Sequence, residues 1–439
     1  MHLKHNQQIM ANIKDKSKYN YDIAHVAWIL LFLSLFSIVL KRDAQAIETL
    51  DTGNFFRIIL VSGSILISMG CLLLRKNGIS VLFGRPQKWL AIYAFVAIFS
   101  CSYASHGFYA TWKAVEIFAH VLVIGAILSS VDPELCTESL FYLCRIMFIM
   151  LIFCIWLGAL IRPSIAFRPI TYGIFPLLEG IWPPINANGV GFISGFLVVV
   201  YTARILDYEI KNKIFAIFVL ILAGSALFFA QARTSLLGCA MAILIYILLC
   251  RKKLFFIGLV GLILCIALWG VGDYIIEYFR RGQNAEMFYS ISGRTLAWNA
   301  AMAYFKESPL IGHGYASAGR FDLLGDGKAS TLHGAVFEVL VGVGIFGLVP
   351  WLLSIISTTY GLWITAYRSK EGDPEHRSLK ALAFAIMIFV IFRATTSSEL
   401  SLHYYSFLVF DILVCMSWNW MRLRQTVVRP IYASNAFHR

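Results

Sequence analysis

The sequence predicts an all-α, multispanning membrane protein, and three observations support this fold class. Of 439 residues, 59% are hydrophobic and only 14% charged, and the mean hydropathy is +0.73, far from the values of soluble globular domains. Apolar runs of about 20 residues, the length that crosses a bilayer as a helix, recur along the chain. Short basic clusters separate these runs, as in cytoplasmic membrane anchors. We therefore expect about twelve transmembrane helices and one large periplasmic loop that itself contains helices.

The charge and cysteine patterns exclude other classes of protein. The net charge is +13, but its basic residues are dispersed among apolar runs, so nucleic-acid binding is not expected. The nine cysteines form no Cys-x-x-Cys pattern and no disulfide framework. A long polar leader precedes the first apolar run and Lys41-Arg42 follows it, so this run is interpreted as an uncleaved span, not as a signal peptide.

Five regions follow in chain order. Residues 1–23 are an expected cytoplasmic tail, 24–270 hold helices one to nine, 271–334 form the large periplasmic loop, 335–418 hold helices ten to twelve, and 419–439 are a cytoplasmic tail. The expected spans are 24–40, 58–74, 89–105, 112–131, 140–161, 186–201, 214–230, 234–250, 254–270, 335–363, 382–392 and 404–418. Between the fifth and the sixth, a segment rich in proline cannot be continuous helix.

The distribution of basic residues indicates the orientation. With the amino terminus inside, most Lys and Arg residues fall on inward segments. Lys41, Arg42 and Arg57 in the first outer loop run against this rule. In this topology Arg233, the long loop and His333 all face outward.

Arg233 is a candidate anion-binding residue. It lies at a hairpin between two apolar runs, next to Gln231 and Thr234, with no acidic residue nearby in the sequence. Snorkelling of the side chain to the membrane surface is the alternative interpretation. A guanidinium group at a helix start suits phosphate oxygens, because its fork matches them and the helix amino terminus adds partial positive charge.

The long loop offers further arginines. Arg294 precedes an expected amphipathic helix, Thr295–Phe305, whose apolar side would carry Leu296, Ala300, Met302 and Phe305. The loop is either a solvated cap or a helix along the membrane that grips a lipid-linked phosphate. Arg320 is a weaker candidate for contact with either substrate.

Histidines supply the candidate base. His333 and His313 lie in the long loop, and His333 stands where the loop meets an apolar, glycine-rich helix that would fix its position. No metal-ligand spacing occurs, so neither a metal nor another cofactor is expected. Lys113 and Glu116 within a span indicate either helix pairing or the proton path of a transporter.

Several motifs occur in a fixed order. They are Asn186-Ala-Asn188-Gly189, Arg233-Thr-Ser-Leu-Leu237, Ser292-Gly-Arg294 with Trp298, Ser308-Pro309-Leu-Ile-Gly312-His-Gly314, and His333 with Glu338, Leu340 and Gly344-Ile-Phe-Gly347. Together they resemble the O-antigen ligase and polymerase superfamily over about the last 260 residues of the chain. Gly334 replaces the asparagine that usually follows the histidine.

The resemblance implies a metal-independent, inverting glycosyltransferase of the bacterial inner membrane, with its active site facing the periplasm. An undecaprenyl-diphosphate-linked glycan would be the donor and lipid A-core the acceptor. Arg233 and Arg294 would hold the diphosphate, His333 would act as base, and Arg320 and His313 are possible substrate contacts. The same motifs allow an O-antigen or exopolysaccharide polymerase or a protein O-oligosaccharyltransferase. A transporter of polysaccharide or lipid-linked glycan is the alternative from a different class, although no paired repeat supports it.

Overall fold

The structure, a computed structural model, describes residues 22–36, 52–76, 78–84, 86–169, 175–207, 212–250, 272–284, 294–323, 332–368 and 374–436, and the single residues 252, 258, 288 and 290. Helices dominate these ranges. They are α2 (Ile23–Ser34), α3 (Thr52–Leu74), α4 (Gly78–Val81), α5 (Gln87–Ser100), α6 (Gly107–Leu128), α7 (Pro133–Ile161), α8 (Pro163–Ala166), α9 (Ala187–Leu206), α10 (Lys213–Ala230), α11 (Arg233–Leu249), α13 (Gly272–Arg280), α15 (Arg294–Phe305), α16 (Ala335–Tyr367), α17 (Pro374–Ala394), α18 (Tyr405–Ala436) and a π-helical turn η2 (Ala318–Leu323).

Helices overlap every expected span except the ninth, 254–270, which apart from residue 258 lies outside the described residues. In the described part of the chain, six helices are long and apolar enough to cross a bilayer, namely α3, α6, α7, α9, α10 and α16. The apolar helices α2, α5 and α11 are shorter. The chain is thus an all-α, multi-pass membrane protein, whereas the total of twelve spans stays a prediction.

The proline-rich segment after α7 is not continuous helix, as expected. The short helix α8 is followed by two small antiparallel ladders, β1 (Phe167–Arg168) with β2 (Leu177–Leu178) and β3 (Gly180–Ile181) with β4 (Pro184–Ile185). Proline cannot donate a backbone hydrogen bond, which explains why helix does not extend through this segment.

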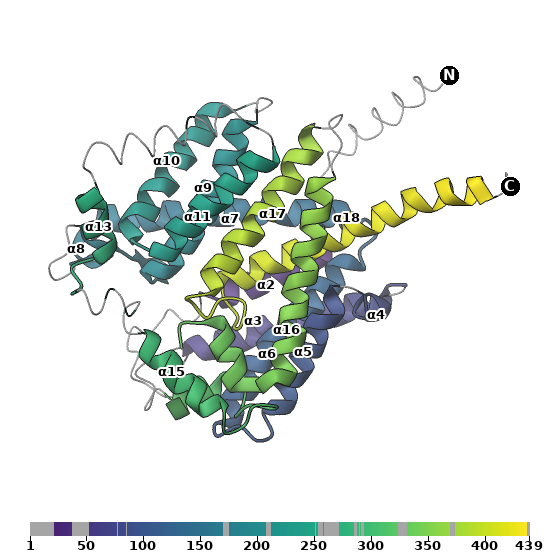
Figure 1. The fold of residues 1–439 in the computed structure, drawn as a ribbon, viewed down its shortest axis with the longest axis horizontal. Helices are drawn as coiled ribbons and strands as arrows, with labels where there is room; N and C mark the ends of the chain where they lie inside the picture. Colours follow the sequence, from purple (N-terminus) through teal and green to yellow (C-terminus); the bar gives the residue numbers. More distant parts are fainter. Residues whose placement is uncertain are drawn as a thin grey trace.

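Helix α17 joins two groups of helices (Figure 1). One group contains α9, α10 and α11, and the other contains α5, α6 and α16. Helix α17 packs against α11 and α9 on one side and against α16 and α18 on the other. Residues at the ends of α17 are therefore placed to contact both groups.

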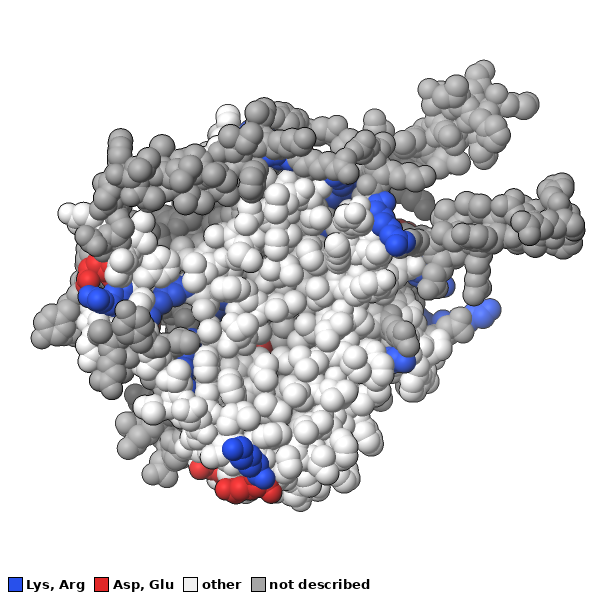
Figure 2. Space-filling model, in the orientation of Figure 1, with Lys and Arg blue, Asp and Glu red and all other residues white. Residues whose placement is uncertain are grey.

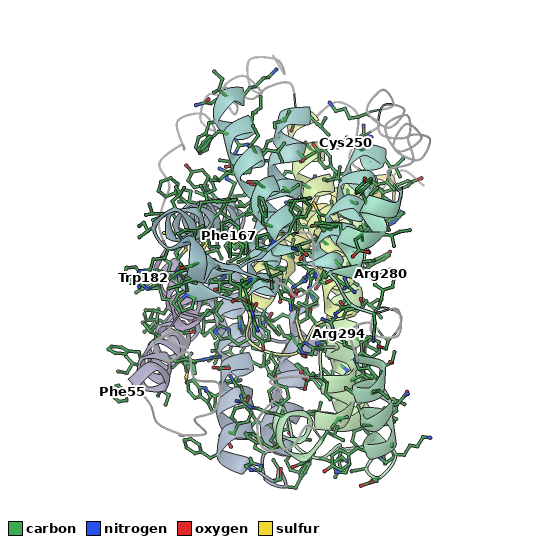
Figure 3. The ribbon with its side chains drawn as sticks, turned by 90° about the vertical axis from the view of Figure 1, so that its left-hand side faces the viewer. Phe55, Phe167, Trp182, Cys250, Arg280 and Arg294 are labelled. Atoms are coloured by element: carbon green, nitrogen blue, oxygen red, sulfur yellow. The ribbon has the colours of Figure 1, made fainter. Side chains whose placement is uncertain are left out.

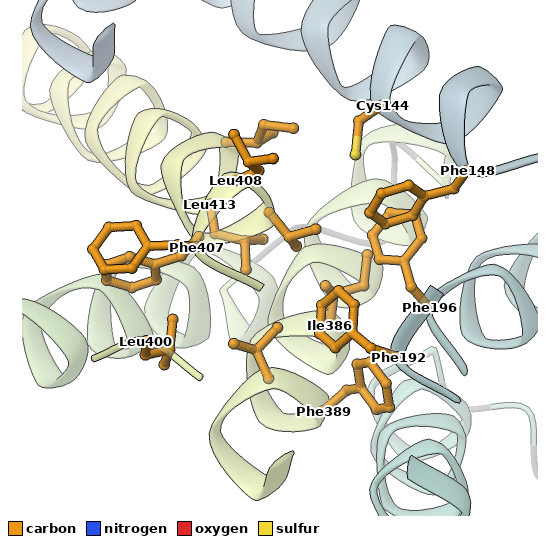
Figure 4. Packing of buried hydrophobic residues seen from close by; sticks show 14 of the residues in the cluster. Cys144, Phe148, Phe192, Phe196, Ile386, Phe389, Leu400, Phe407, Leu408 and Leu413 are labelled. Carbon is orange, nitrogen blue, oxygen red and sulfur yellow. The ribbon is translucent and has the colours of Figure 1, made fainter. Parts of the chain in front are cut away.

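Aromatic side chains pack among aliphatic ones in the buried core (Figure 4). Phe148 of α7 meets Phe196 of α9 edge to face at 5.1 Å, and Phe192 of α9 lies 5.4 Å from Phe389 of α17. Lipid tails are as apolar as these side chains, so close packing rather than exclusion of water holds such helices together. The face shown in Figure 2 is mostly free of charged side chains, which lie around its margins, as expected for a surface in contact with lipid.

Helix α16 is broken at Gly344, where the backbone adopts φ 61° and ψ −161°. The loop around Pro309 to Gly314 fills the break. Ile345 N donates to Pro309 O at 2.9 Å, and Gly314 N donates to Gly342 O at 2.9 Å. The continuous tenth span predicted from the sequence is thus two helical pieces, because loop carbonyls take the place of the helix's own acceptors. This junction holds the beginning of α16 against the long loop.

Replacing Gly344 with alanine is expected to lower the free energy of unfolding by about 2–4 kcal/mol, because its left-handed φ disfavours other residues and the new methyl group would overlap backbone. A Cβ there would lie 2.4 Å from the carbonyl atoms of Leu310. Gly224→Ala is the matched control, since a Cβ at Gly224 meets nothing within 4 Å. Thermal unfolding of the two variants in detergent measures the effect. Equal midpoints for both would contradict the described junction.

Candidate functional site

Arg233 is the first residue of α11, at the end of a tight hairpin from α10. Gln231 makes the turn with a left-handed φ of 47°, and its side-chain amide donates to Phe175 O at 2.8 Å. The Arg233 guanidinium donates to Gln283 Oε1 at 2.6 Å and to Arg280 O at 3.2 Å, and it lies over the Phe288 ring at 5.2 Å. These contacts connect the start of α11 to the long loop.

Arg393 lies in the last turn of α17 and is almost fully buried, at 1% exposure. Its guanidinium donates to Thr234 Oγ1 at 3.0 Å and to Asn188 O at 3.2 Å, and it pairs with the Glu399 carboxylate. It thereby connects the starts of α9 and α11 to the end of α17. This arginine directly follows the predicted eleventh span and was not among the candidates from the sequence. An arginine at the end of an apolar run with a glutamate six residues later was the available signal.

Arg294 opens α15 and donates to Thr396 O at 2.6 Å, in the loop that follows α17. Figure 3 shows Arg280 and Arg294 on the same side of the molecule. Burial lowers the pKa of Arg294, and the positive charges of Arg393 and Arg233 lower it further. Arg233, Arg393 and Arg294 are therefore close enough for their charges to act on one another.

Arg281 belongs to the same group of charges. Burial, followed by the positive charge of Arg233, lowers the pKa of the Arg281 guanidinium to about 10, so it remains charged at neutral pH. Arg281 has a left-handed φ of 54°, and its Nε atom is buried without a hydrogen-bond partner among the described residues. We call Arg233, Arg281, Arg294 and Arg393 the arginine cluster. Glu399 is the acidic residue paired within it.

His333 lies beside this cluster, in the turn before α16, and is half-buried. Burial lowers the pKa of its imidazole below the ordinary value, and the positive charge of Arg294 adds to that effect. The ring is therefore neutral at physiological pH and able to accept a proton. His333 has a left-handed φ of 54°, a conformation in which histidine and asparagine are more common than most residues.

Glu338 holds the backbone next to His333. Its carboxylate, in the first turn of α16, accepts from Leu332 N at 2.5 Å and from Ser398 Oγ at 3.1 Å. Trp298 Nε1 donates to Leu332 O at 3.1 Å. A Cβ at Gly334 would lie 2.9 Å from Phe337 Cδ2 and 3.0 Å from Trp298 Nε1, so these two rings occupy the space that a side chain at this position would need. The turn that carries His333 is thus fixed from α15, α16 and the loop after α17.

Of the four residues on the expected apolar side of α15, Phe305 packs against the protein, whereas Leu296, Ala300 and Met302 are exposed. Leu296 is 74% exposed, whereas Ala301 is fully buried and packs with Leu332 and Val341. Ala297, Tyr304 and Phe305 also pack against this cluster, and Trp298 reaches Leu332 O. A helix that lies along the membrane would turn its exposed apolar side chains toward lipid.

The remaining two candidates, Arg320 and His313, lie in other surroundings. Arg320 donates to Tyr109 Oη at 3.0 Å, on α6. The His313 ring stacks on Tyr304 at 3.8 Å, and its Nε2 is 2.9 Å from Tyr304 O. The structure therefore brings together Arg233, Arg294 and His333, adds Arg281 and Arg393, and places Arg320 and His313 elsewhere.

The arrangement can bind an anion and remove a proton next to it. Guanidinium groups stabilise phosphate oxygens, and the neutral imidazole is a base. In the described part of the chain, no three His, Cys, Asp or Glu side chains gather as metal ligands would.

The comparisons with known proteins point to the same family as the motifs. Residues 218–352 match the family model described as O-Antigen ligase. The match spans Arg233, Arg294 and His333, but not Arg393. No curated protein matches the chain. The match over residues 218–352 is to the same family that the sequence motifs resemble, and it supports that resemblance.

Proposed function

We propose that this protein is an O-antigen ligase. It transfers a preassembled glycan from undecaprenyl diphosphate to lipid A-core at the periplasmic face of the inner membrane, without a metal and with inversion at the anomeric carbon. The observation that carries the proposal is the arginine cluster beside His333. The match to the O-antigen ligase family supports the class of enzyme.

The arginine cluster suits a diphosphate leaving group. Among the described residues, four guanidinium groups accompany one paired carboxylate, that of Glu399, which gives the cluster a surplus of positive charge. When the bond between the anomeric carbon and the diphosphate oxygen breaks, the electron pair stays on that oxygen. Fixed positive groups in a partly buried site stabilise this charge without needing to reorient. In this role the arginines replace a divalent metal ion.

His333 would accept the proton from the acceptor hydroxyl. The hydroxyl oxygen attacks the anomeric carbon from the face opposite the diphosphate, and the proton passes to the neutral imidazole. Arg294 links the two functions, since it belongs to the arginine cluster and its charge acts on His333. His313 and Arg320 have no part in these steps.

The membrane layout is part of the proposal. Twelve spans, with tails 1–23 and 419–439 in the cytoplasm and the loop 271–334 in the periplasm, put the arginine cluster and His333 on the periplasmic side. Cysteine labelling from outside the cell at Asn284, which is exposed, and at Arg377 in the expected cytoplasmic loop tests this orientation. Labelling at position 377 without labelling at position 284 would show the opposite orientation in the membrane.

The decisive experiment is a gel of lipopolysaccharide and carrier-linked glycan from a deletion strain complemented with wild type or variants. Rough lipid A-core alongside long polymer on the carrier supports a ligase. Core bearing a single repeat supports a polymerase instead. An unchanged surface glycan would contradict both and favour a transporter.

The pH dependence of transfer should show the environment of His333. Because its pKa is lowered in the folded protein, the acid limb of kcat/KM is expected to lie below the ordinary histidine value of about 6.5. Removing the positive charge in Arg294→Gln raises the pKa, so the acid limb of the residual activity moves to higher pH. A pH profile of both proteins with fixed donor and acceptor measures this. A shift to lower pH in the variant would contradict the assignment.

A further inference from the structure

A second basic cluster lies outside the arginine cluster, on α3, α6 and the long loop. Glu116 on α6 pairs with Arg57 of α3 and with Lys113 Nζ, at 3.0 Å for the lysine. Arg320 donates to Tyr109 Oη at 3.0 Å, with its guanidinium 5.1 Å from the centre of that ring. Lys113 Nζ lies 5.7 Å from the same ring centre. We call Arg57, Lys113 and Arg320 the second basic cluster.

The charges of the second basic cluster do not balance among the described residues. Three cations surround one paired carboxylate, that of Glu116, which is fully buried. The charges that act on Lys113 are those of Arg57, Arg320 and Glu116. Asp322 accepts from the neutral hydroxyl of Ser105 at 2.8 Å and forms an ion pair with none of the three cations. Counted over the four described groups Arg57, Lys113, Arg320 and Glu116, the cluster has a surplus of about two positive charges, at a depth where water screens poorly.

If the second basic cluster only paired helices, it would not need a surplus of positive charge. Arg57 is 4% exposed and by itself neutralises Glu116, which is sufficient to pair α3 with α6. The Lys113 side chain is 14% exposed and Arg320 is half-buried. Both groups can therefore meet a ligand from outside. A phosphate monoester carries about 1.5 to 2 negative charges at neutral pH, which matches the surplus.

The second basic cluster is connected to the site around His333 through Tyr315. The backbone N of Tyr315 donates to Ser100 Oγ at 3.0 Å, and its phenol donates to Ser401 O. Burial raises the pKa of this phenol, and the carboxylates of Glu116 and Glu338 both raise it further. Tyr315 is therefore held between α5 and the loop after α17, where the charges of Glu116 and Glu338 both act on its phenol, after the larger effect of the neighbouring Tyr93.

We propose that the second basic cluster binds a phosphate group of the lipid-anchored acceptor, while the arginine cluster binds the diphosphate of the donor. This inference rests on the proposed transfer reaction. Two acceptors share the chemistry: a phosphorylated lipid A-core, and a second lipid-diphosphate glycan. Lys113 and Arg320 act in acceptor binding and take no part in bond breaking.

The test is a kinetic comparison of wild type with the double variant Lys113→Gln/Arg320→Gln, using full-length protein in nanodiscs. Arg57 is left in place, so Glu116 keeps a partner. The KM for the acceptor is expected to rise about ten- to a hundredfold, the loss that one or two charge-assisted hydrogen bonds produce. The KM for the donor and kcat should not change. Arg162→Gln, which removes an exposed cation elsewhere, is the matched control.

Removing the phosphate from the acceptor distinguishes a loss of phosphate binding from a folding defect of the variant. With phosphatase-treated lipid A-core, wild type should show the raised KM and the double variant no further increase. An equal penalty with treated and untreated acceptor would overturn the proposal. Parallel assays with lipid A-core and with a second lipid-diphosphate glycan identify the source of the phosphate, because only the true acceptor shows the difference.

Binding without turnover gives a second measurement. Radiolabelled lipid A-core, before and after phosphatase treatment, is titrated onto wild type, the double variant, and Lys113→Arg/Arg320→Lys, which keeps both charges. Recovery of affinity in the charge-preserving variant is expected, and equally weak binding in both variants would contradict a phosphate site. If Arg233→Gln left donor consumption intact, the proposed function would fail while this binding result still stood.

Discussion

Replacing His333 with asparagine is expected to lower kcat for glycan transfer by about 10²–10⁴, the usual contribution of a positioned general base. Asparagine suits the left-handed φ of 54° and keeps a polar side chain of similar size, but it cannot accept the proton. The turn should therefore stay folded through Glu338 and Trp298, which bind the backbone of Leu332 and not the imidazole. Loss of rate without loss of donor affinity would identify His333 as the base.

His313→Asn is the matched control, because His313 lies in the same loop but its ring packs on Tyr304. This variant should retain transfer within a few fold and lose only some thermal stability. Single-turnover transfer from purified donor to acceptor measures both variants. Near wild-type rate in His333→Asn, or a larger loss in His313→Asn, would assign the proton transfer to another group.

Apolar runs in the sequence predicted the positions of the helices, because a bilayer requires each span to satisfy its backbone within one helix. The break at Gly344 could not be predicted in this way. Gly342 and Gly344 fit a continuous apolar helix as well as a broken one. The break is caused by the loop at Pro309 to Gly314, whose carbonyl groups accept hydrogen bonds from the backbone N–H groups of Ile345 and Phe346. That contact depends on residues distant in the sequence.

Residues of the candidate site could be predicted only where both the residue type and its place in the sequence indicated a functional role. Arg233 stood out as a charge between two apolar runs, and Arg294 and His333 carried family motifs. Arg393 was missed because a charge at the end of a span usually marks the membrane surface. Its contacts with Thr234 and Asn188 come from the packing of α17 between α9 and α11, which no local pattern contains.

Arg281 and α15 also show that local sequence patterns do not contain contacts made by tertiary packing. Arg280 and Arg281 are adjacent and equal in chemistry, and only the backbone turn at Arg281 directs one of them toward Arg233. In α15 the periodicity places Leu296 and Phe305 on one side, but Phe305 packs against the buried cluster around Leu332 while Leu296 is 74% exposed. Which of them meets protein depends on the position of α16, which the local pattern does not contain.

Replacing Arg294 with glutamine is expected to lower kcat by about 10²–10³, the loss produced when one donor to a developing negative charge is removed. Arg294 donates to Thr396 O through Nη1, which leaves other N–H groups of the guanidinium for a ligand. Arg233→Gln should cause a loss of similar size. Because both act on one diphosphate, the double variant should lose less than the product of the two single effects.

Arg280→Gln is the control for Arg233 and Arg294. Its side chain is 42% exposed and lies 3.9 Å from Glu277, while its contact with Arg233 uses only the backbone carbonyl, which the substitution keeps. Arg294→Lys should recover only part of the rate, since lysine keeps the charge but not the planar fork. Transfer rates at saturating acceptor measure all five variants. Only a group that meets the leaving oxygen is expected to change kcat selectively. Full activity in Arg294→Gln would therefore show that the diphosphate binds elsewhere. A loss in Arg280→Gln as large as that in Arg294→Gln would show the same.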